Sequence, residues 1–185
     1  MLKFLLFFMI AVIVFLGMPF IGFGKSLEAV AADAARYFGI GEDEYEIRFL
    51  KKVVNAQTGE EVNGTHKWDF IKTEDGVKPI HSIEVQKSFS RPFSIATIFH
   101  EFAHAAQDKY DMRDSYGDFT REQHAELLAF RMLWRSGYWW NGTHMILMHT
   151  FRAKPKEYLV AGHLWNNALT GASPVSMPTF RVPVA

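Results

Sequence analysis

Two histidines and a glutamate lie within one short stretch of the chain, at a spacing that suits metal chemistry. The stretch is His100-Glu101-Phe102-Ala103-His104, the arrangement written HExxH. On a helix, residues four apart lie one turn apart on the same face, so both imidazoles can reach one ion. A zinc ion lowers the pKa of a bound water to about 7. The spacing therefore predicts a zinc site with His100 and His104 as ligands and Glu101 as the base that deprotonates the water.

The residues around this motif predict a buried helix over residues 94–109. Apolar side chains recur at helical spacing, at Ile95, Ile98, Phe99, Phe102, Ala103 and Ala106. A buried helix that carries two histidines and a carboxylate needs partners for these polar groups. A bound metal ion is the partner that this set of side chains favours.

A catalytic zinc also needs a third protein ligand and one open position. The metzincin pattern would place Gly at 107 and His at 110, where this chain has Gln107 and Tyr110. The chain has no cysteine, which excludes thiolate ligands and disulfide bonds. Asp114 could bind zinc, but the residues around it do not match the aspzincin pattern. The better candidate lies downstream, in the acidic segment Glu122-Gln123-His124-Ala125-Glu126.

This acidic segment lies in a predicted helix over residues 120–136, with Thr120 as its cap and Gly137 just past its end. With the HExxH motif it resembles the gluzincin metallopeptidases over about residues 80–136. The resemblance implies that Glu122 is the third zinc ligand and that Ala125 lets the two helices lie close together. It also implies that Glu126, where Asp or Asn is common, holds a ligand histidine. Because Glu122 and Glu126 share a helix face, Glu126 remains an alternative ligand.

The fold class expected is α+β, with a small antiparallel sheet packed on the HExxH helix and the Glu-ligand helix. Helices are also predicted over residues 26–38 and 155–169, with a short one over residues 144–151. The predicted strands contain Tyr45, Ile47 and Phe49, then His66, Trp68 and Phe70, and then residues 80–85. We expect residues 80–86 to form the edge strand that pairs with an extended substrate.

Three regions are expected along the chain. Residues 1–24 contain an apolar run over residues 2–24, which suits a membrane-spanning helix, a cleaved signal peptide or a buried core helix. Residues 25–171 form the zincin-like domain, and residues 172–185 form an extended tail that contains prolines. The positive-inside rule slightly favours a domain outside the cytoplasm. Lys and Arg together number 20, as do Asp and Glu, and no basic stripe favours a nucleic-acid partner.

The expected function is that of a zinc-dependent metallopeptidase that hydrolyses peptide or protein substrates through a water activated by Glu101. It would be anchored to a membrane through residues 2–24 with an extracytoplasmic domain, or secreted after signal cleavage. Two alternatives remain, a non-catalytic zinc-binding module and a zincin that acts on a non-peptide amide. The oxyanion-stabilising residue is left open among four candidates, Tyr116, His144, His149 and His163. His124 is expected to be a surface or core histidine.

Overall fold

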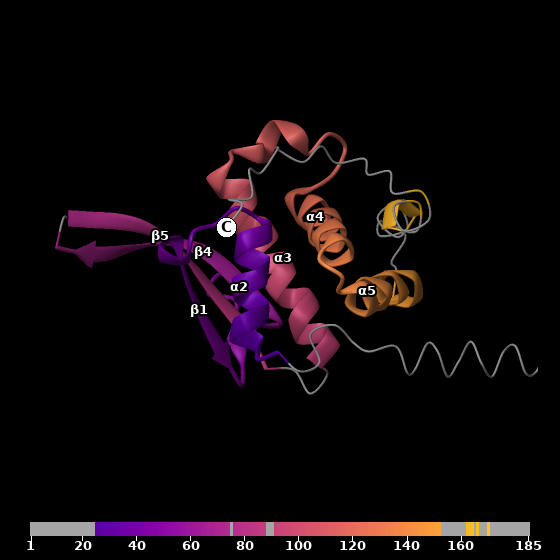
Figure 1. Cartoon of the computed structure of the whole chain (residues 1–185), viewed down its shortest axis with the longest axis horizontal. Helices are drawn as coiled ribbons and strands as arrows, with labels where there is room; N and C mark the ends of the chain where they lie inside the picture. Colours follow the sequence, from indigo (N-terminus) through magenta and orange to yellow (C-terminus); the bar gives the residue numbers. More distant parts are fainter. Residues whose placement is uncertain are drawn as a thin grey trace, which may run out of the picture.

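A long helix, α3 (Arg91–Lys109), stands between a small sheet and a pair of helices (Figure 1). The structure is a computed structural model, and it describes residues 25–74, 76–87, 91–152, 162–164, 166 and 170. In this part of the chain the sheet and α2 (Leu27–Tyr37) lie on one side of α3, and α4 (Arg121–Arg135) and α5 (Trp139–Arg152) lie on the other. The α+β class predicted from the sequence is confirmed.

The helices α2 and α4 begin and end where capping residues predict. The Ser26 hydroxyl accepts a hydrogen bond from the Ala29 amide at 3.1 Å, and α2 is followed by Gly39 with φ of 66°. Thr120 forms a capping box with Gln123 at the start of α4, and Gly137 follows its end with φ of 81°. These contacts satisfy backbone groups that the helix ends would otherwise leave unpaired.

Helix α5 begins five residues earlier than predicted, at Trp139 rather than residue 144. Gly142 lowers the helix propensity of this segment, which is why the sequence predicts a later start. A methyl group on the Gly142 α-carbon would lie 3.1 Å from the Trp134 ring and 3.3 Å from the Phe130 ring. Close packing against α4 therefore favours glycine here and overrides local propensity.

Three strands form one mixed sheet rather than the antiparallel sheet that was predicted. The strand order is β1 (Tyr45–Leu50), β5 (Gly76–Gln86), β4 (Gly64–Thr73). β4 and β5 form the expected antiparallel hairpin, but β1 runs parallel to β5. The prediction was wrong for β1 because the chain between β1 and β5 is long. It contains a two-stranded unit, β2 (Val53–Val54) with β3 (Glu61–Val62), and then β4. Parallel neighbours need such a longer connection.

The prediction that residues 80–86 form the edge strand is also wrong. They lie in β5, whose two sides pair with β1 and β4, so β5 is the central strand. Its residues 80–83 are all buried, as expected of a strand covered on both faces. The edge nearest α3 is formed by β4, whose Gly64 pairs with Val85 and whose Thr73 pairs with Gly76.

The remaining elements are two 3₁₀ turns, η1 (Glu42–Glu44) and η2 (Met112–Ser115). The expected apolar segment of residues 1–24 and the expected tail of residues 172–185 lie outside the described residues. Most of the helix predicted over residues 155–169 lies outside them too, and the residues of it that are described are helical. Among the described helices, none combines the length and apolar character needed to cross a membrane.

Aromatic rings join α2 and α3 to the start of α5. The Phe99 ring lies with its centroid 6.5 Å from that of Phe38 and 5.4 Å from that of Tyr138. All three side chains are buried. The Tyr138 hydroxyl also donates a hydrogen bond to Asp33 at 2.8 Å. Phe99 is therefore central to the packing that fixes the HExxH helix.

We expect Phe99→Ala to lower the free energy of unfolding by about 3–5 kcal/mol, because it opens a cavity in this aromatic group. Phe70→Ala is the control, since Phe70 lies on the β4–β5 hairpin and is 67% exposed. Urea unfolding followed by circular dichroism would measure both. Equal effects of the two substitutions would contradict this account of the core.

Candidate metal centre

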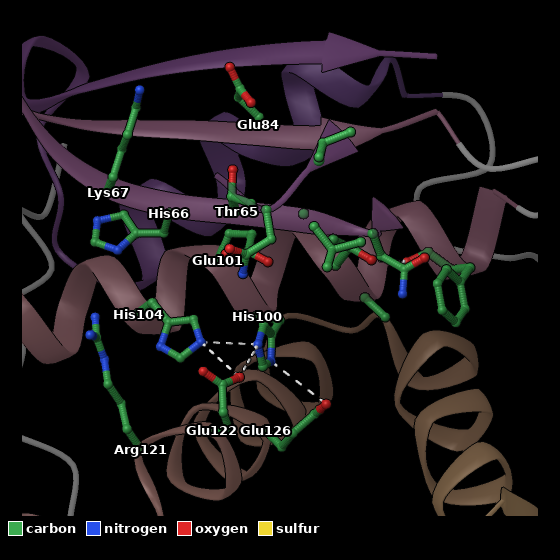
Figure 2. A pocket seen from close by; sticks show the side chains of 18 of the residues that line it. Thr65, His66, Lys67, Glu84, His100, Glu101, His104, Arg121, Glu122 and Glu126 are labelled. Atoms are coloured by element: carbon green, nitrogen blue, oxygen red, sulfur yellow. Dashed lines mark hydrogen bonds and ion pairs between the residues drawn. The ribbon is translucent and has the colours of Figure 1, made fainter. Parts of the chain in front are cut away.

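Three nitrogen and oxygen atoms from two helices converge beside α3. His104 Nε2 lies 3.1 Å from His100 Nε2, and each of these nitrogens lies 3.3 Å from Glu122 Oε2. The histidines come from successive turns of α3, and Glu122 comes from the first turn of α4 (Figure 2). The structure therefore brings together the three side chains expected to be ligands.

The triangle has the size that a zinc ion requires. Zinc bonds to histidine and carboxylate are about 2.0–2.1 Å long, so two ligand atoms of a tetrahedral site lie about 3.3–3.4 Å apart. The observed separations of 3.1 to 3.3 Å fit this geometry. Two imidazole nitrogens and one carboxylate oxygen are also a ligand set of catalytic zinc. Within the described residues, these are the His, Asp or Glu side chains grouped closely enough to hold an ion.

Acidic side chains surround the two histidines of the triangle and change their electrostatic environment. Burial disfavours the charged form of His100, but the carboxylates of Glu126, Glu122 and Glu101 outweigh it and raise its pKa to about 9. Hydrogen bonds from His100 and His104 lower the pKa of the Glu122 carboxyl. The two shifts are reciprocal, because each charged imidazole and the carboxylates beside it stabilise one another.

Glu101 lies beside the triangle and is almost completely buried, at 5% exposure. It points toward the strand β4, next to Thr65 in the view of Figure 2. Burial raises the pKa of its carboxyl, and the imidazoles of His100 and His104 partly oppose this. A carboxyl with a raised pKa next to a metal site has the properties of a general base.

A cleft of about 630 Å³ opens over these residues. Its walls come from β4, from the loop that joins β2 to β3, and from α3, α4 and α5. The Glu122 side chain is 72% exposed, whereas those of His100 and His104 are 18% and 8% exposed. The triangle is therefore open to solvent on its Glu122 side, where a catalytic site needs a free position.

A second layer of side chains contacts the two histidines. Glu126 Oε1 lies 3.7 Å from His100 Nδ1, one helical turn beyond Glu122. Glu126 thus lies behind His100, but the expected hydrogen bond is not formed, because His100 Nδ1 has no hydrogen-bond partner in the described part of the chain. His104 Nδ1 instead lies 2.8 Å from the side-chain oxygen of Gln107. The sequence analysis assigned no role to Gln107, although its position three residues after His104 places both on one helix face.

The structure separates the other candidate residues. Among the four candidates for oxyanion stabilisation, His144 lines the cleft, while the side chain of His149 lies outside the described part of the chain. Tyr116 packs on His124 and His163 packs on Phe119. Asp114 lies in η2, away from the residues that line the cleft. His124 is fully buried, which confirms the core alternative for it.

His66 also lies beside the centre, a position that the sequence analysis did not predict. Its Nε2 is 2.9 Å from His81 Nδ1, and its Nδ1 is 3.6 Å from Asp108 Oδ2. Burial lowers the pKa of His66 to about 3, so it is neutral in the fold at physiological pH. Asp108 also accepts two hydrogen bonds from Arg121, at 2.9 and 3.0 Å. Asp108 thereby connects α3 to α4 and lies close to His66 on β4.

Comparisons with known proteins do not classify the chain. No family model matches it, and no curated protein or solved structure shows significant similarity to it. The site is therefore assigned from its own residues and their geometry.

We expect purified wild-type protein to bind one zinc ion and Glu122→Ala to weaken that binding more than 100-fold, because a ligand is lost. Glu126→Ala removes a group behind a ligand and should weaken binding about 10- to 100-fold. Competition titration against a zinc-binding dye would rank the variants. Glu84→Ala is the control, because Glu84 lines the same cleft from β5.

Two results would change this assignment. Absence of any transition metal from the wild-type protein would reject the metal centre. A larger loss in Glu126→Ala than in Glu122→Ala would move the third ligand one turn along α4.

Proposed function

We propose that the protein is a zinc metallopeptidase that hydrolyses peptide bonds in peptide or protein substrates. The observation that supports this most is the convergence of His100, His104 and Glu122 at tetrahedral spacing with the buried carboxyl of Glu101 beside them. A purely structural site would have no use for a carboxylate at position 101. The cleft over these residues gives an extended chain access to them.

The roles of the side chains follow from their positions. His100, His104 and Glu122 would hold zinc, which when bound polarises a carbonyl group and acidifies water. Glu101 accepts a proton from the attacking water and then transfers it to the nitrogen of the leaving amine. Its burial favours this exchange, because the raised pKa makes the carboxyl a better proton acceptor than an exposed glutamate.

The edge strand β4 is suited to bind the substrate backbone. Its residues Gly64, Thr65, His66 and Lys67 line the cleft. In the sheet, β4 pairs with β5 on one side, and its other side is the edge of the described sheet. An extended peptide can add to such an edge through main-chain hydrogen bonds. In this proposal β4 takes the part that the sequence analysis gave to residues 80–86.

We expect Glu101→Gln to keep the metal and the fold but to lower kcat by about 10²- to 10⁴-fold, because the base is lost while the ligands remain. Cleavage of casein and of a mixed peptide library would measure the rate, and elemental analysis would measure zinc. Glu84→Gln is the matched control in the cleft wall. Wild-type activity in Glu101→Gln would reject the mechanism.

We expect Gly64→Ala to reduce turnover at least about 10-fold while zinc affinity changes little. A methyl group on Gly64 would lie 2.6 Å from Glu101 Oε1 and 2.7 Å from Thr97 Cγ2, so Glu101 must move. Small displacements of a catalytic group have large effects on rate. Lys72→Ala, an exposed position further along the same strand and outside the cleft lining, is the control. If Gly64→Ala lowered zinc affinity as much as turnover, the effect would lie in the ligands rather than in Glu101.

A further inference from the structure

The side chain of Gln107 is buried and makes three hydrogen bonds. It is 1% exposed and lies on α3, one turn beyond His104. Its Oε1 is 2.8 Å from His104 Nδ1, and its Nε2 is 2.9 Å from the main-chain oxygen of Arg121 and 2.8 Å from His124 Nδ1. One oxygen and two amide hydrogens are thus each matched to one partner.

The main-chain oxygen of Arg121 decides which way round the amide lies. A carbonyl oxygen can only accept a hydrogen bond, so the NH₂ group of Gln107 must face Arg121. The amide oxygen then faces His104 and can only accept. His104 must therefore carry a proton on Nδ1, so that in the neutral ring the lone pair lies on Nε2, the atom that faces His100 and Glu122. The amide selects the tautomer that a metal ligand requires.

The second hydrogen of the amide decides the state of His124. Nδ1 of His124 must accept it, so the proton of this neutral ring lies on Nε2. The ring has 0% exposure and packs on Tyr116. His124 thus holds Gln107 in place from the core side of α4.

The same amide also connects the two helices that carry ligands. The carbonyl that accepts its hydrogen bond belongs to Arg121, the residue directly before Glu122. His104 and the first turn of α4 are therefore held by opposite ends of one planar group. Any shift of α4 along α3 would break the hydrogen bond to Arg121 and move Glu122 relative to His104.

We propose that Gln107 is a positioning residue of the metal centre, which sets the tautomer of His104 and the placement of Glu122 through one amide group. The inference rests on the proposed zinc site, but the two hydrogen bonds that it invokes join groups of the protein alone. It can therefore be tested whether or not the protein cleaves peptides.

The first test is nuclear magnetic resonance of the ¹⁵N-labelled protein, with and without added zinc. In the wild type we expect a proton on His104 Nδ1 that exchanges slowly with water, because it is buried and bonded to Gln107. In Gln107→Met this protection should be lost, and amides in the first turn of α4 should exchange faster. In Gln107→Glu the carboxylate still accepts from Nδ1 but cannot donate to Arg121, so the Nδ1 proton should stay protected while the α4 amides do not.

The second test is zinc affinity by competition with a chelating dye. We expect Gln107→Met to weaken binding about 10- to 100-fold and Gln107→Glu to weaken it less. Val30→Ala is the control for general destabilisation, since Val30 is fully buried in α2. Its zinc affinity should stay at the wild-type value.

The proposal would be overturned by a wild-type His104 that lacks a protected Nδ1 proton. It would also be overturned if Gln107→Met and Val30→Ala weakened zinc binding equally. A wild-type protein that binds no zinc would reject the proposed function, while the exchange of the Nδ1 proton would still decide the role of Gln107.

Discussion

The close packing of α3 against α4 is the constraint on which the site depends. Glu122 must approach two histidines on another helix to within 3.3 Å, although its own side chain is short. Small residues on both helices make this possible, and Ala103 and Ala106 on α3 and Ala125 and Ala129 on α4 are fully buried. Larger side chains at such positions would increase the distance between the helix axes and separate the ligands.

The last turns of α3 fix this packing in register. Gln107 binds the main chain of Arg121, and Asp108 binds its guanidinium group with both carboxylate oxygens. Two successive residues thus hold the first residue of α4, which directly precedes the proposed ligand Glu122. Asp108 also lies near His66, so the same turn of α3 lies beside both the edge strand β4 and the first turn of α4. In the cleft, α3 therefore lies in the middle, with β4 on one side and α4 on the other.

The parts of this arrangement that were predictable are those that depend on local spacing. His100 and His104 were found because four residues make one helical turn, and the caps at Ser26 and Thr120 because their signals lie within a few residues. The order of the strands was not found, because pairing of β1 with β5 joins segments over thirty residues apart. The central position of β5 was also missed. Its residues Ile80-His81-Ser82-Ile83 are buried on both faces, but the two polar residues do not have the apolar character expected of such a strand. Gln107 has the right spacing from His104, yet its other two hydrogen-bond partners lie on α4, and local spacing does not predict them.

Burial explains why an amide, rather than a carboxylate, contacts His104 Nδ1. Glu101, Glu122 and Glu126 already place three acidic groups around His100 and His104. Glu126 keeps its side chain 28% exposed in the cleft, where water can stabilise its charge. Position 107 is 1% exposed, and a fourth carboxylate there would face the carbonyl oxygen of Arg121 with no cation to offset it. A glutamine accepts from His104 without adding charge, and its two hydrogens satisfy the other acceptors. A neutral acceptor is thus the group that this position can bury.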